Sequence, residues 1–440
     1  MSEWKKYKLG EVAEITSSKR IFLADYVSNG IPFYRSKEVI ERFKKSTIST
    51  ELFIEKSKFE EIKNKFGAPK ENDILLTSVG TIGIPFKVRK DDEFYFKDGN
   101  LTWFRNYSGQ LNPDYLFYWI QSSIGKEAIG KTKIGSTQQA LTIASLKQIE
   151  ITVPDLTTQT QIAQILTSLD DKIELNLQMN QTLEAMAQAL FKEWFVKFNF
   201  PKCLNLDSLD LPDEQDFDKE KEKNQGNQEN PKNHGSDNGL PKGWKVGKLG
   251  EIVDVKGGTT PSTTIEEYWN GEFYWTTPKD LSNIQAPVLI DTERKITALG
   301  VKQISSGVMP KGTLLLSSRA PIGYIAISQV PISINQGYIA IQGKLVSNLF
   351  MLFWLKQNMD AVKSKANGST FQEISKSNFR EIETTIPSKE VLEQFDEMAN
   401  PIFEKIVENV FQIQTLTQTR DTLLPKLISG KISLNYDFCD

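Results

Sequence analysis

The 440-residue chain contains the same set of sequence motifs twice, in the same order. Four pairs of segments carry this repeat: residues 4–12 with 244–252, 72–78 with 312–318, 135–137 with 368–370, and 149–154 with 382–387. The offset is 240 residues for the first two pairs and 233 for the last two. Ordered matches at a nearly constant offset indicate a tandem duplication, so both halves should share one architecture.

Each repeat begins with a block of short apolar runs bounded by Gly, Pro and Asn, a pattern typical of strands. The clearest runs are residues 74–76, 94–96, 313–316 and 324–327. Asn112 and Pro113 predict the N-cap and first turn of a helix, and Asn348 begins the equivalent run in the second repeat. Each block closes on a strand ending at Pro154 or Pro387, followed by a long helix. The expected fold class is therefore α+β, with two mixed α/β domains and two long helices.

Both long helices carry an apolar seam with heptad spacing. Alternate steps of four and three give Ile162, Leu166, Leu169, Ile173, Asn176, Asn180, Leu183, Ala187, Leu190 and Trp194. Adding 233 gives Phe395, Ala399, Ile402, Ile406, Asn409, Ile413, Leu416, Arg420, Leu423 and Leu427. Seams of this length predict a coiled coil. The alternative is that each helix packs only on its own domain.

Antiparallel pairing of two equal helices would give a pseudo-twofold molecule with one domain at each end. Centring the two seams on each other puts Asn180 opposite Asn409, and a buried Asn pair would penalise slipped registers. Thirty-three helical residues span roughly 50 Å, against about 34 Å for one turn of DNA. Such a rod suits two half-sites about one turn apart.

Six segments follow from these patterns: 1–153 (first domain), 154–200 (central helix), 201–240 (linker), 241–387 (second domain), 388–431 (C-terminal helix) and 432–440 (tail). The linker is acidic and polar, contains the only histidine, His234, and is expected to be a flexible tether. Cys203 and Cys439 lie in polar stretches and imply no disulfide framework.

The charge distribution favours phosphate contact by the two domains. The chain has a net charge of −3, but residues 1–153 hold 24 Lys and Arg against 19 Asp and Glu, and residues 241–386 hold 16 against 12. Two basic blocks are thus joined by acidic helices and linker. No run of about 18 apolar residues predicts a membrane span, and the N-terminus lacks a signal-peptide core, so we expect a cytoplasmic protein with no membrane partner.

Two patterns imitate catalytic motifs. Residues 112–115, Asn-Pro-Asp-Tyr, resemble the Asn/Asp-Pro-Pro-Tyr motif of amino-group DNA methyltransferases, but lack the second Pro and fit a helix start. Pro154-Asp155 with Asp170 and Lys172 imitates a nuclease pattern, but the latter two fall on the helix, where a solvated face is expected. The chain has too few His and Cys for a convincing triad or zinc site, and no ATP-binding loop.

The whole chain apart from the linker resembles the specificity (S) subunits of type I restriction–modification systems. The resemblance is carried by Trp-x-x-x-x-Leu-Gly-Glu, by the Leu-Leu strands and Gly-Ser-Thr segments, and by the closing strands. It continues in residues 161–176, 183–187 and 424–432. It departs from the family after the closing strands, where Pro-Pro-Leu-x-Glu-Gln is replaced at 154–161 and 387–394, so the helix starts could dock partners differently.

The resemblance implies a non-catalytic subunit that binds double-stranded DNA at a split, asymmetric site. Two methyltransferase (M) subunits would bind the helical region and two restriction (R) subunits would join for cleavage. No cofactor is expected on this chain, since S-adenosylmethionine, ATP and Mg would belong to the partners. Two other classes stay open: a self-contained methyltransferase or nuclease, and a coiled-coil adaptor that does not bind DNA.

Loop residues able to hydrogen-bond bases or phosphates are the DNA-binding candidates. In the first domain they are Ser17, Ser18, Lys19, Arg20, Arg35, Lys37, Lys133, Ser136, Thr137 and Gln138. In the second they are Lys256, Thr259, Thr260, Thr276, Lys279, Ser318, Arg319, Asn367, Ser369 and Thr370. The Gly-Ser-Thr segments could equally be turns that need Gly. For helix pairing the candidates are Ile162, Leu166, Leu169, Ile173, Asn176, Asn180, Leu183, Asn409, Ile413 and Leu416.

Overall fold

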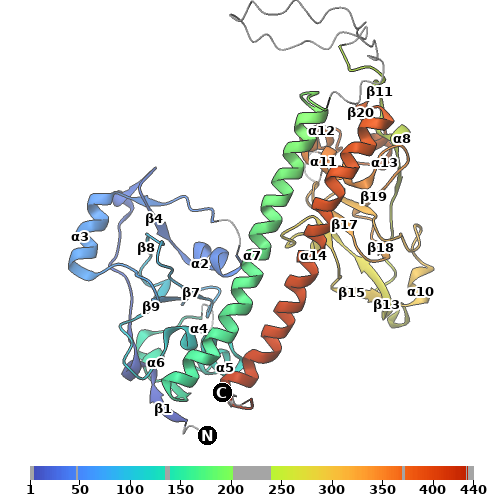
Figure 1. Ribbon diagram of the computed structural model, residues 1–440. Coiled ribbons are helices and arrows are strands. Elements are labelled where there is room, and N and C mark those ends of the chain that lie inside the picture. Colours follow the sequence, from blue (N-terminus) through green and yellow to red (C-terminus); the bar gives the residue numbers. More distant parts are fainter. Residues whose placement is uncertain are drawn as a thin grey trace, which may run out of the picture. The chain divides into compact units, whose positions relative to one another are not determined.

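The computed structural model describes residues 4–45, 48–133, 139–201, 239–368, 372–432 and 434 (Figure 1). The chain divides into two compact units. Unit 1 comprises Met1–Leu175 and Gln414–Asp440, and unit 2 comprises Asn176–Ile413. Each unit therefore holds one α/β domain together with a segment of each long helix.

Unit 1 contains a four-stranded antiparallel sheet in the order β2-β9-β6-β7, a second sheet in the order β3-β5-β4-β8, and the pair β1-β10. Its strands are β1 Lys5–Lys8, β2 Glu14–Thr16, β3 Tyr26–Val27, β4 Ile31–Tyr34, β5 Phe53–Ile54, β6 Ile74–Thr77, β7 Pro85–Lys87, β8 Tyr95–Phe96, β9 Leu101–Arg105 and β10 Glu150–Val153. Its helices are α1 Leu9–Val12, η1 Leu23–Asp25, α2 Ser36–Phe43, α3 Lys56–Phe66, α4 Pro113–Gln121, α5 Ser123–Gly130, α6 Ile143–Lys147 and the first part of α7 Leu156–Phe195.

Unit 2 repeats this plan with a five-stranded sheet, β12-β19-β16-β17-β14, a three-stranded sheet, β15-β13-β18, and the pair β11-β20. Its strands are β11 Lys245–Lys248, β12 Val253–Lys256, β13 Trp269–Thr276, β14 Val288–Leu289, β15 Arg294–Ile296, β16 Leu314–Ser317, β17 Ile325–Ser328, β18 Ile332–Ile334, β19 Tyr338–Gly343 and β20 Glu383–Ile386. Its helices are α8 Leu249–Ile252, η3 Glu266–Tyr268, α9 Pro278–Leu281, α10 Ala298–Val301, α11 Asn348–Gln357, α12 Met359–Ser364, α13 Lys376–Arg380 and part of α14 Lys389–Ile428.

The duplicated motifs occupy equivalent places in the two domains. β1 pairs antiparallel with β10 so that Lys8 faces Glu150, and β11 pairs with β20 so that Lys248 faces Glu383. The Gly that follows each of these strands lies against a helix: a Cβ on Gly10 would come within 2.8 Å of the Lys147 side chain. A Cβ on Gly250 would come within 3.0 Å of the equivalent Arg380. The Leu-Gly-Glu motif thus recurs because a close packing contact recurs.

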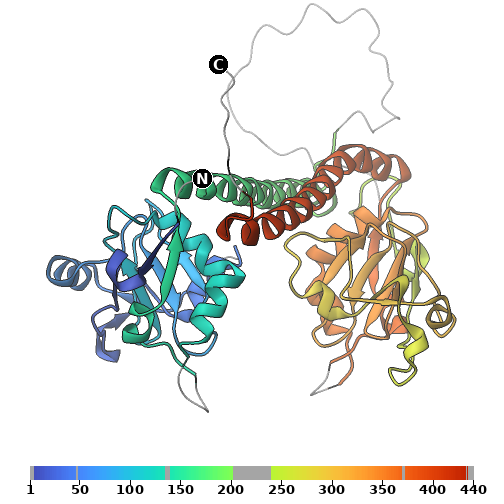
Figure 2. The same cartoon turned by 90° about the horizontal axis from the view of Figure 1, so that it is seen from below.

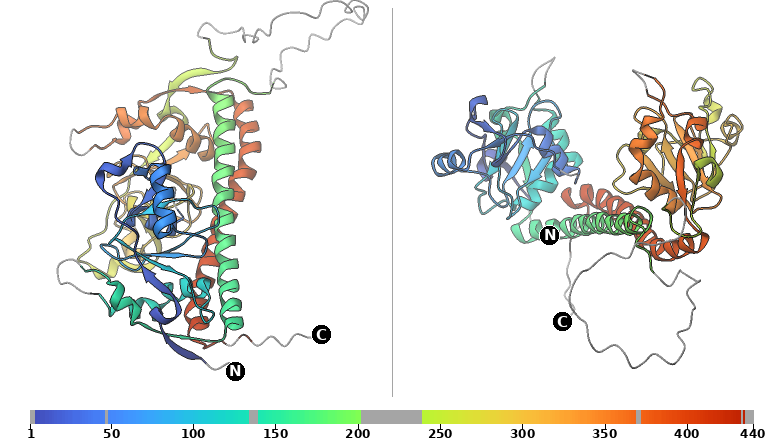
Figure 3. Two further views of the ribbon diagram at one scale, coloured as in Figure 1. Left: turned by 90° about the vertical axis from the view of Figure 1, so that its left-hand side faces the viewer. Right: turned by 90° about the horizontal axis from the view of Figure 1, so that it is seen from above.

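Segments of α7 and α14 pair antiparallel within each unit (Figure 3). In unit 2, Asn409 donates its side-chain amide to Oδ1 of Asn180 at 2.9 Å, and Asn176 donates to Oε1 of Gln412 at 2.6 Å. The partner's number falls as the α7 number rises, which defines the antiparallel direction. The Asn180–Asn409 contact is the one that the seam analysis predicts.

Among the seam residues, Ile162, Leu166 and Ile173 are buried, as are the three asparagines Asn176, Asn180 and Asn409. Leu169, Leu183, Ile413 and Leu416 are half-buried. In unit 1 the seam is partly ionic, because Arg420 of α14 donates to Asp170 of α7 at 2.7 Å.

Each domain core contains the end of the other repeat's helix. In unit 1, Leu424, Leu427 and Ile428 of α14 pack in one apolar cluster with Ile162, Leu166 and the buried face of α4. The alternative that each long helix packs only on its own domain is therefore wrong.

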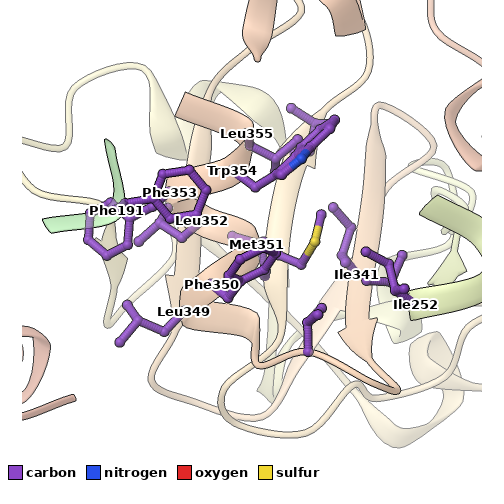
Figure 4. Close-up of a cluster of buried hydrophobic side chains, with 14 of the residues drawn as sticks. Phe191, Ile252, Ile341, Leu349, Phe350, Met351, Leu352, Phe353, Trp354 and Leu355 are labelled. Carbon is purple, nitrogen blue, oxygen red and sulfur yellow. The ribbon is translucent and has the colours of Figure 1, made fainter. Parts of the chain in front are cut away.

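The core of unit 2 follows the same rule. Ala187, Phe191 and Trp194 of α7 join a cluster built around α11 and Phe395 of α14. Figure 4 shows the Phe191 ring beside Phe350 and Phe353. The ring centroids of Phe191 and Phe350 are 5.3 Å apart, and those of Phe191 and Phe395 are 5.9 Å apart. Such aromatic packing adds to the free energy of burial.

The compact units cut across the segments that the sequence suggests, because each helix is shared between them. Most of the 201–240 linker, including His234 and Cys203, lies outside the described residues, and so do most of the tail and Cys439. Within the described part of the chain, no helix is both long and apolar enough to span a membrane.

Candidate nucleic-acid interface

The loop after β2 in unit 1 is held by its two serines. Ser17 donates to the carbonyl of Leu101 at 3.1 Å, and Ser18 donates to that of Phe96 at 2.7 Å. These hydrogen bonds tie the loop to the ends of β8 and β9. Ser17 and Ser18 therefore support the loop, whereas the sequence predicts them as DNA contacts.

The next two candidates point outward from this loop. Lys19 and Arg20 are exposed, and the backbone N–H of Lys19 donates to the hydroxyl of Tyr95 at 2.8 Å. The ammonium of Lys19 lies 4.8 Å from the ring centre of Phe66. Arg20 pairs with Asp98 at 3.0 Å, but its side chain remains 68% exposed. A fixed backbone with two exposed cations on it is suited to contact phosphates.

Arg35 has a structural partner. Its guanidinium donates to Glu38 at 2.8 Å, and Glu38 is fully buried at the start of α2. The hydrogen bond that Arg35 donates to Glu38 raises the pKa of Arg35. Lys37 and Lys133 are exposed, and Lys37 lies 3.9 Å from Glu51. Ser136, Thr137 and Gln138 fall outside the described residues.

Two candidates of unit 2 are buried. The hydroxyl of Thr276 lies 3.2 Å from that of Tyr338, and Ser318 donates its backbone N–H to Gly337 at 2.8 Å. Both side chains are at most 3% exposed, so neither reaches DNA without rearrangement. Thr276 and Ser318 make hydrogen bonds inside the domain, at the ends of strands β13 and β16.

The other candidates of unit 2 that the structure describes are exposed or half-buried. Thr259 donates to the carbonyl of Gln303 at 2.8 Å, and Thr260 donates to Oε1 of Gln336 at 2.6 Å. Lys279 is hydrogen-bonded to Glu293 at 2.8 Å, which raises the pKa of the lysine. Lys256 is exposed at the end of β12.

Arg319 and Asn367 both contact Glu373. Arg319 lies 3.5 Å from the Glu373 carboxylate, and the backbone of Asn367 exchanges two hydrogen bonds with that of Glu373. They bring together the loop after β16 and the segment that precedes α13. Ser369 and Thr370 belong to this segment but fall outside the described residues.

The catalytic look-alikes have structural roles. Asn112 caps α4, its side chain accepting from the backbone N–H groups of Asp114 and Tyr115. Asp170 lies on helix α7, but it is not on the solvated face that the sequence suggested: it pairs with Arg420 and receives a hydrogen bond from Tyr118 at 2.9 Å. Among the residues that the structure describes, no cluster of three His, Cys, Asp or Glu side chains could hold a metal ion.

Comparison with known families accounts for the duplicated plan. The model of the type I restriction modification DNA specificity domain matches residues 1–185 and again residues 241–415. The chain belongs to this family. Both matches run from the opening motif of a domain into its long helix, so one specificity domain consists of an α/β domain and its helix.

Individual proteins similar to this chain are specificity subunits of type I restriction enzymes. The chain is 42% identical over 189 residues to the type I restriction enzyme MjaIX specificity subunit of Methanocaldococcus jannaschii, an alignment that covers 39% of this chain and 44% of that protein. It is 27% identical over 472 residues to the type I restriction enzyme HindI specificity subunit of Haemophilus influenzae, covering 98% of this chain and all of the relative.

A solved structure shows the same fold. The crystal structure of the type I restriction–modification S subunit from M. genitalium matches with a TM-score of 0.60 at 18% identity, covering 97% of this chain and 96% of that one. The expected α+β class, with two specificity domains and two long helices, is confirmed.

Proposed function

We propose that this specificity-family chain is the DNA-reading subunit of a type I restriction–modification complex, in which each α/β domain reads one half of a split DNA site. The observation that carries the proposal is the double match of the specificity-domain model to two complete copies of one scaffold. The two copies differ in their loops, as expected if they read different bases: Lys19 and Arg20 of the first correspond, at the offset of 240, to Thr259 and Thr260 of the second.

The scaffold supports this role because it holds the loops rigidly. In each domain the opening strand pairs with the closing strand, and the long helix starts within three residues of that closing strand. The core then incorporates the end of the other repeat's helix, so a loop in either domain is anchored to both helices. Rigid support lowers the entropy lost on binding.

The chemistry would belong to other subunits of a cytoplasmic complex. Two M subunits would bring S-adenosylmethionine and methylate adenine, and two R subunits would bring ATP and Mg for translocation and cleavage. This chain would supply none of these cofactors. Its part is to bind double-stranded DNA and direct the partners to the site.

The proposal is tested by methyl transfer with a reconstituted complex. The full chain, assembled with M subunits, should direct labelled S-adenosylmethionine to adenines in specific DNA, and the chain alone should transfer no label. Transfer by the chain alone would establish an enzyme. Transfer with unchanged sequence preference when the chain is omitted would remove its role as the reader.

The alternative function, a coiled-coil adaptor that does not bind DNA, is distinguished by measuring the affinity for duplex DNA across a salt series. Phosphate contact predicts an affinity for duplex DNA that falls steeply as salt rises, with a slope of about −0.9 per neutralised phosphate. An adaptor predicts no binding at any salt concentration.

A further inference from the structure

Arg294 is fixed on the surface of unit 2 by two tryptophans. It begins β15 and faces Trp275 in the antiparallel register with β13. The guanidinium carbon lies 3.4 Å from the ring centre of Trp269 and 5.6 Å from that of Trp275. The two rings meet nearly perpendicularly at 5.0 Å and belong to a small buried cluster with Ile296 and Ile304. A cation held over an indole face keeps its direction as well as its charge.

This guanidinium has no acidic partner among the described residues. The other two arginines of unit 2 are satisfied within the protein: Arg319 pairs with Glu373, and Arg380 donates to the carbonyl of Val255 at 3.1 Å. The nearest acidic neighbour in sequence, Glu293, is hydrogen-bonded to Lys279 instead. Arg294 is exposed, so its N–H donors face solvent.

The tryptophans tie Arg294 to a loop already considered as a DNA contact. Trp275 donates its indole N–H to the carbonyl of Thr259 at 3.4 Å, and Trp269 donates to the carbonyl of Ser262 at 3.0 Å. The cluster under Arg294 is separate from the core that packs on α7 and α14. Figure 1 shows β13 and β15 at the end of unit 2 away from α11.

We propose that Arg294 is a DNA contact of the second domain, which presents its guanidinium to a pair of acceptor atoms on the duplex. The acceptors are either the O6 and N7 atoms of a guanine or two oxygens of a phosphate, because both match the planar fork of donors. This inference rests on the proposed function. The stack leaves the donors at the guanidinium edge free, and the restrained side chain loses little entropy when it binds.

The test uses the full chain assembled with M subunits and a pool of duplexes with randomised sequence. Selected DNA is sequenced for wild type, Arg294→Ala and Arg294→Lys, and affinity for the selected duplex is measured across salt. Lys295→Ala is the matched control, since it removes one positive charge from the opposite face of the same strand, where Lys295 lies over Tyr274. Thermal unfolding of each variant shows whether the domain is intact.

If Arg294 reads a guanine, both Ala and Lys variants lose the preference at one position of one half-site by about 10- to 100-fold. If it contacts a phosphate, Arg294→Ala weakens binding to all sequences and lowers the salt slope by about 1, whereas Arg294→Lys keeps most of the affinity. In both cases the other half-site and the Lys295→Ala complex behave like wild type.

Three outcomes overturn the inference. If wild type selects a two-part motif and both Arg294 variants select and bind it equally well, Arg294 only stabilises its strand, while the proposed function stands. Arg294 also has only a structural role if two results occur together. Arg294→Lys would unfold like wild type and keep both the sequence preference and the salt slope, and Arg294→Ala would lose DNA binding only in proportion to its loss of folded protein. If wild type selects no sequence and does not bind DNA, the proposed function fails and this inference fails with it.

Discussion

The side-chain amide of Asn409 donates to Oδ1 of Asn180 across the helix pair at 2.9 Å, and both residues are at most 2% exposed. The contact is a polar point in an otherwise largely apolar seam. Replacing one partner leaves the other amide buried without its hydrogen bond, which costs about 1–3 kcal/mol. It also removes a feature that selects one register of the helices.

Single and double Asn-to-Leu variants test this pair by urea unfolding. We expect Asn180→Leu and Asn409→Leu each to lower the free energy of unfolding by about 1–3 kcal/mol. The double variant should be more stable than the sum of the two losses predicts, because no amide is left unpaired. Strictly additive losses would mean that the two side chains do not interact.

The register can also be tested by crosslinking. A chain with Cys203→Ser and Cys439→Ser, carrying Asn180→Cys and Asn409→Cys, should form an intramolecular disulfide on oxidation. The matched control keeps Asn180→Cys and replaces Asn409→Cys by Gln412→Cys. Because Gln412 contacts Asn176 in the other helix, the yield of the disulfide should fall. Equal yields from both positions would contradict a single register.

Leu427 tests whether the first domain needs the end of the second repeat's helix. Leu427→Ala should cost about 2–5 kcal/mol, because it opens a cavity beside a side chain that is 2% exposed. Hydrogen exchange should become faster in α4 of unit 1. Thr422→Ala changes an exposed residue that precedes Leu427 on α14 and should alter stability by no more than about 0.5 kcal/mol. Faster exchange confined to the second domain would be inconsistent with this core.

The Arg89–Glu174 pair predicts a pH dependence of unit 1. Arg89 donates to Glu174 at 2.7 Å, and this hydrogen bond lowers the pKa of the Glu174 carboxyl from its usual value of 4.5. Since the pKa is lower in the folded state, the carboxylate adds stability that is complete above pH 4.5 and is lost as the pH falls through the folded-state pKa.

Glu174→Gln should therefore remove part of the acid sensitivity of unfolding. The free-energy difference between wild type and variant should be constant near neutral pH and should shrink below pH 4.5. Unfolding measured over a pH series checks this, and Glu127→Gln, on the exposed α5 pair with Lys131, is the control. A difference that grows as the pH falls would have the wrong sign.

The two arginine candidates of the first domain should respond differently to substitution. Arg35→Ala leaves buried Glu38 without its ion pair, so we expect lower stability, whatever its effect on DNA. Arg20→Ala changes a largely exposed side chain and should keep the melting temperature while weakening DNA binding and lowering the salt slope by about 1. Unfolding and binding measured together separate these effects. Normal binding by Arg20→Ala would remove Arg20 from the interface.

The sequence predicts those features that depend on spacing. The duplication, the closing strands at Pro154 and Pro387 and the Asn180–Asn409 contact follow from offsets and heptad periodicity, which need no tertiary information. Spacing could not reveal that Leu427 packs in the core of the first domain, or that Phe191 packs in the core of the second. The sequence pattern of an apolar helix face is the same whether the helix packs on its own domain or on another one.

The individual DNA-binding candidates were less predictable, because residue type does not reveal burial. Thr276 and Ser318 have suitable side chains but lie inside unit 2, where they satisfy strand ends. Arg294 was not among the candidates because its two tryptophans become neighbours only through the β13–β15 register and the irregularity between Trp269 and Phe273. No signal in the sequence alone marks Arg294, because both its tryptophan contacts and its lack of an acidic partner are visible only in the structure.

The most direct test of the account is a map of methylated adenines in DNA modified by the reconstituted complex. Two specificity domains on one chain predict methylation within a site that has two short specified segments separated by a spacer of unspecified bases. Substitutions in the loops of one domain should change one segment and leave the other intact. A single uninterrupted recognition sequence, or a loop substitution that alters both segments alike, would contradict the division of reading between the two domains.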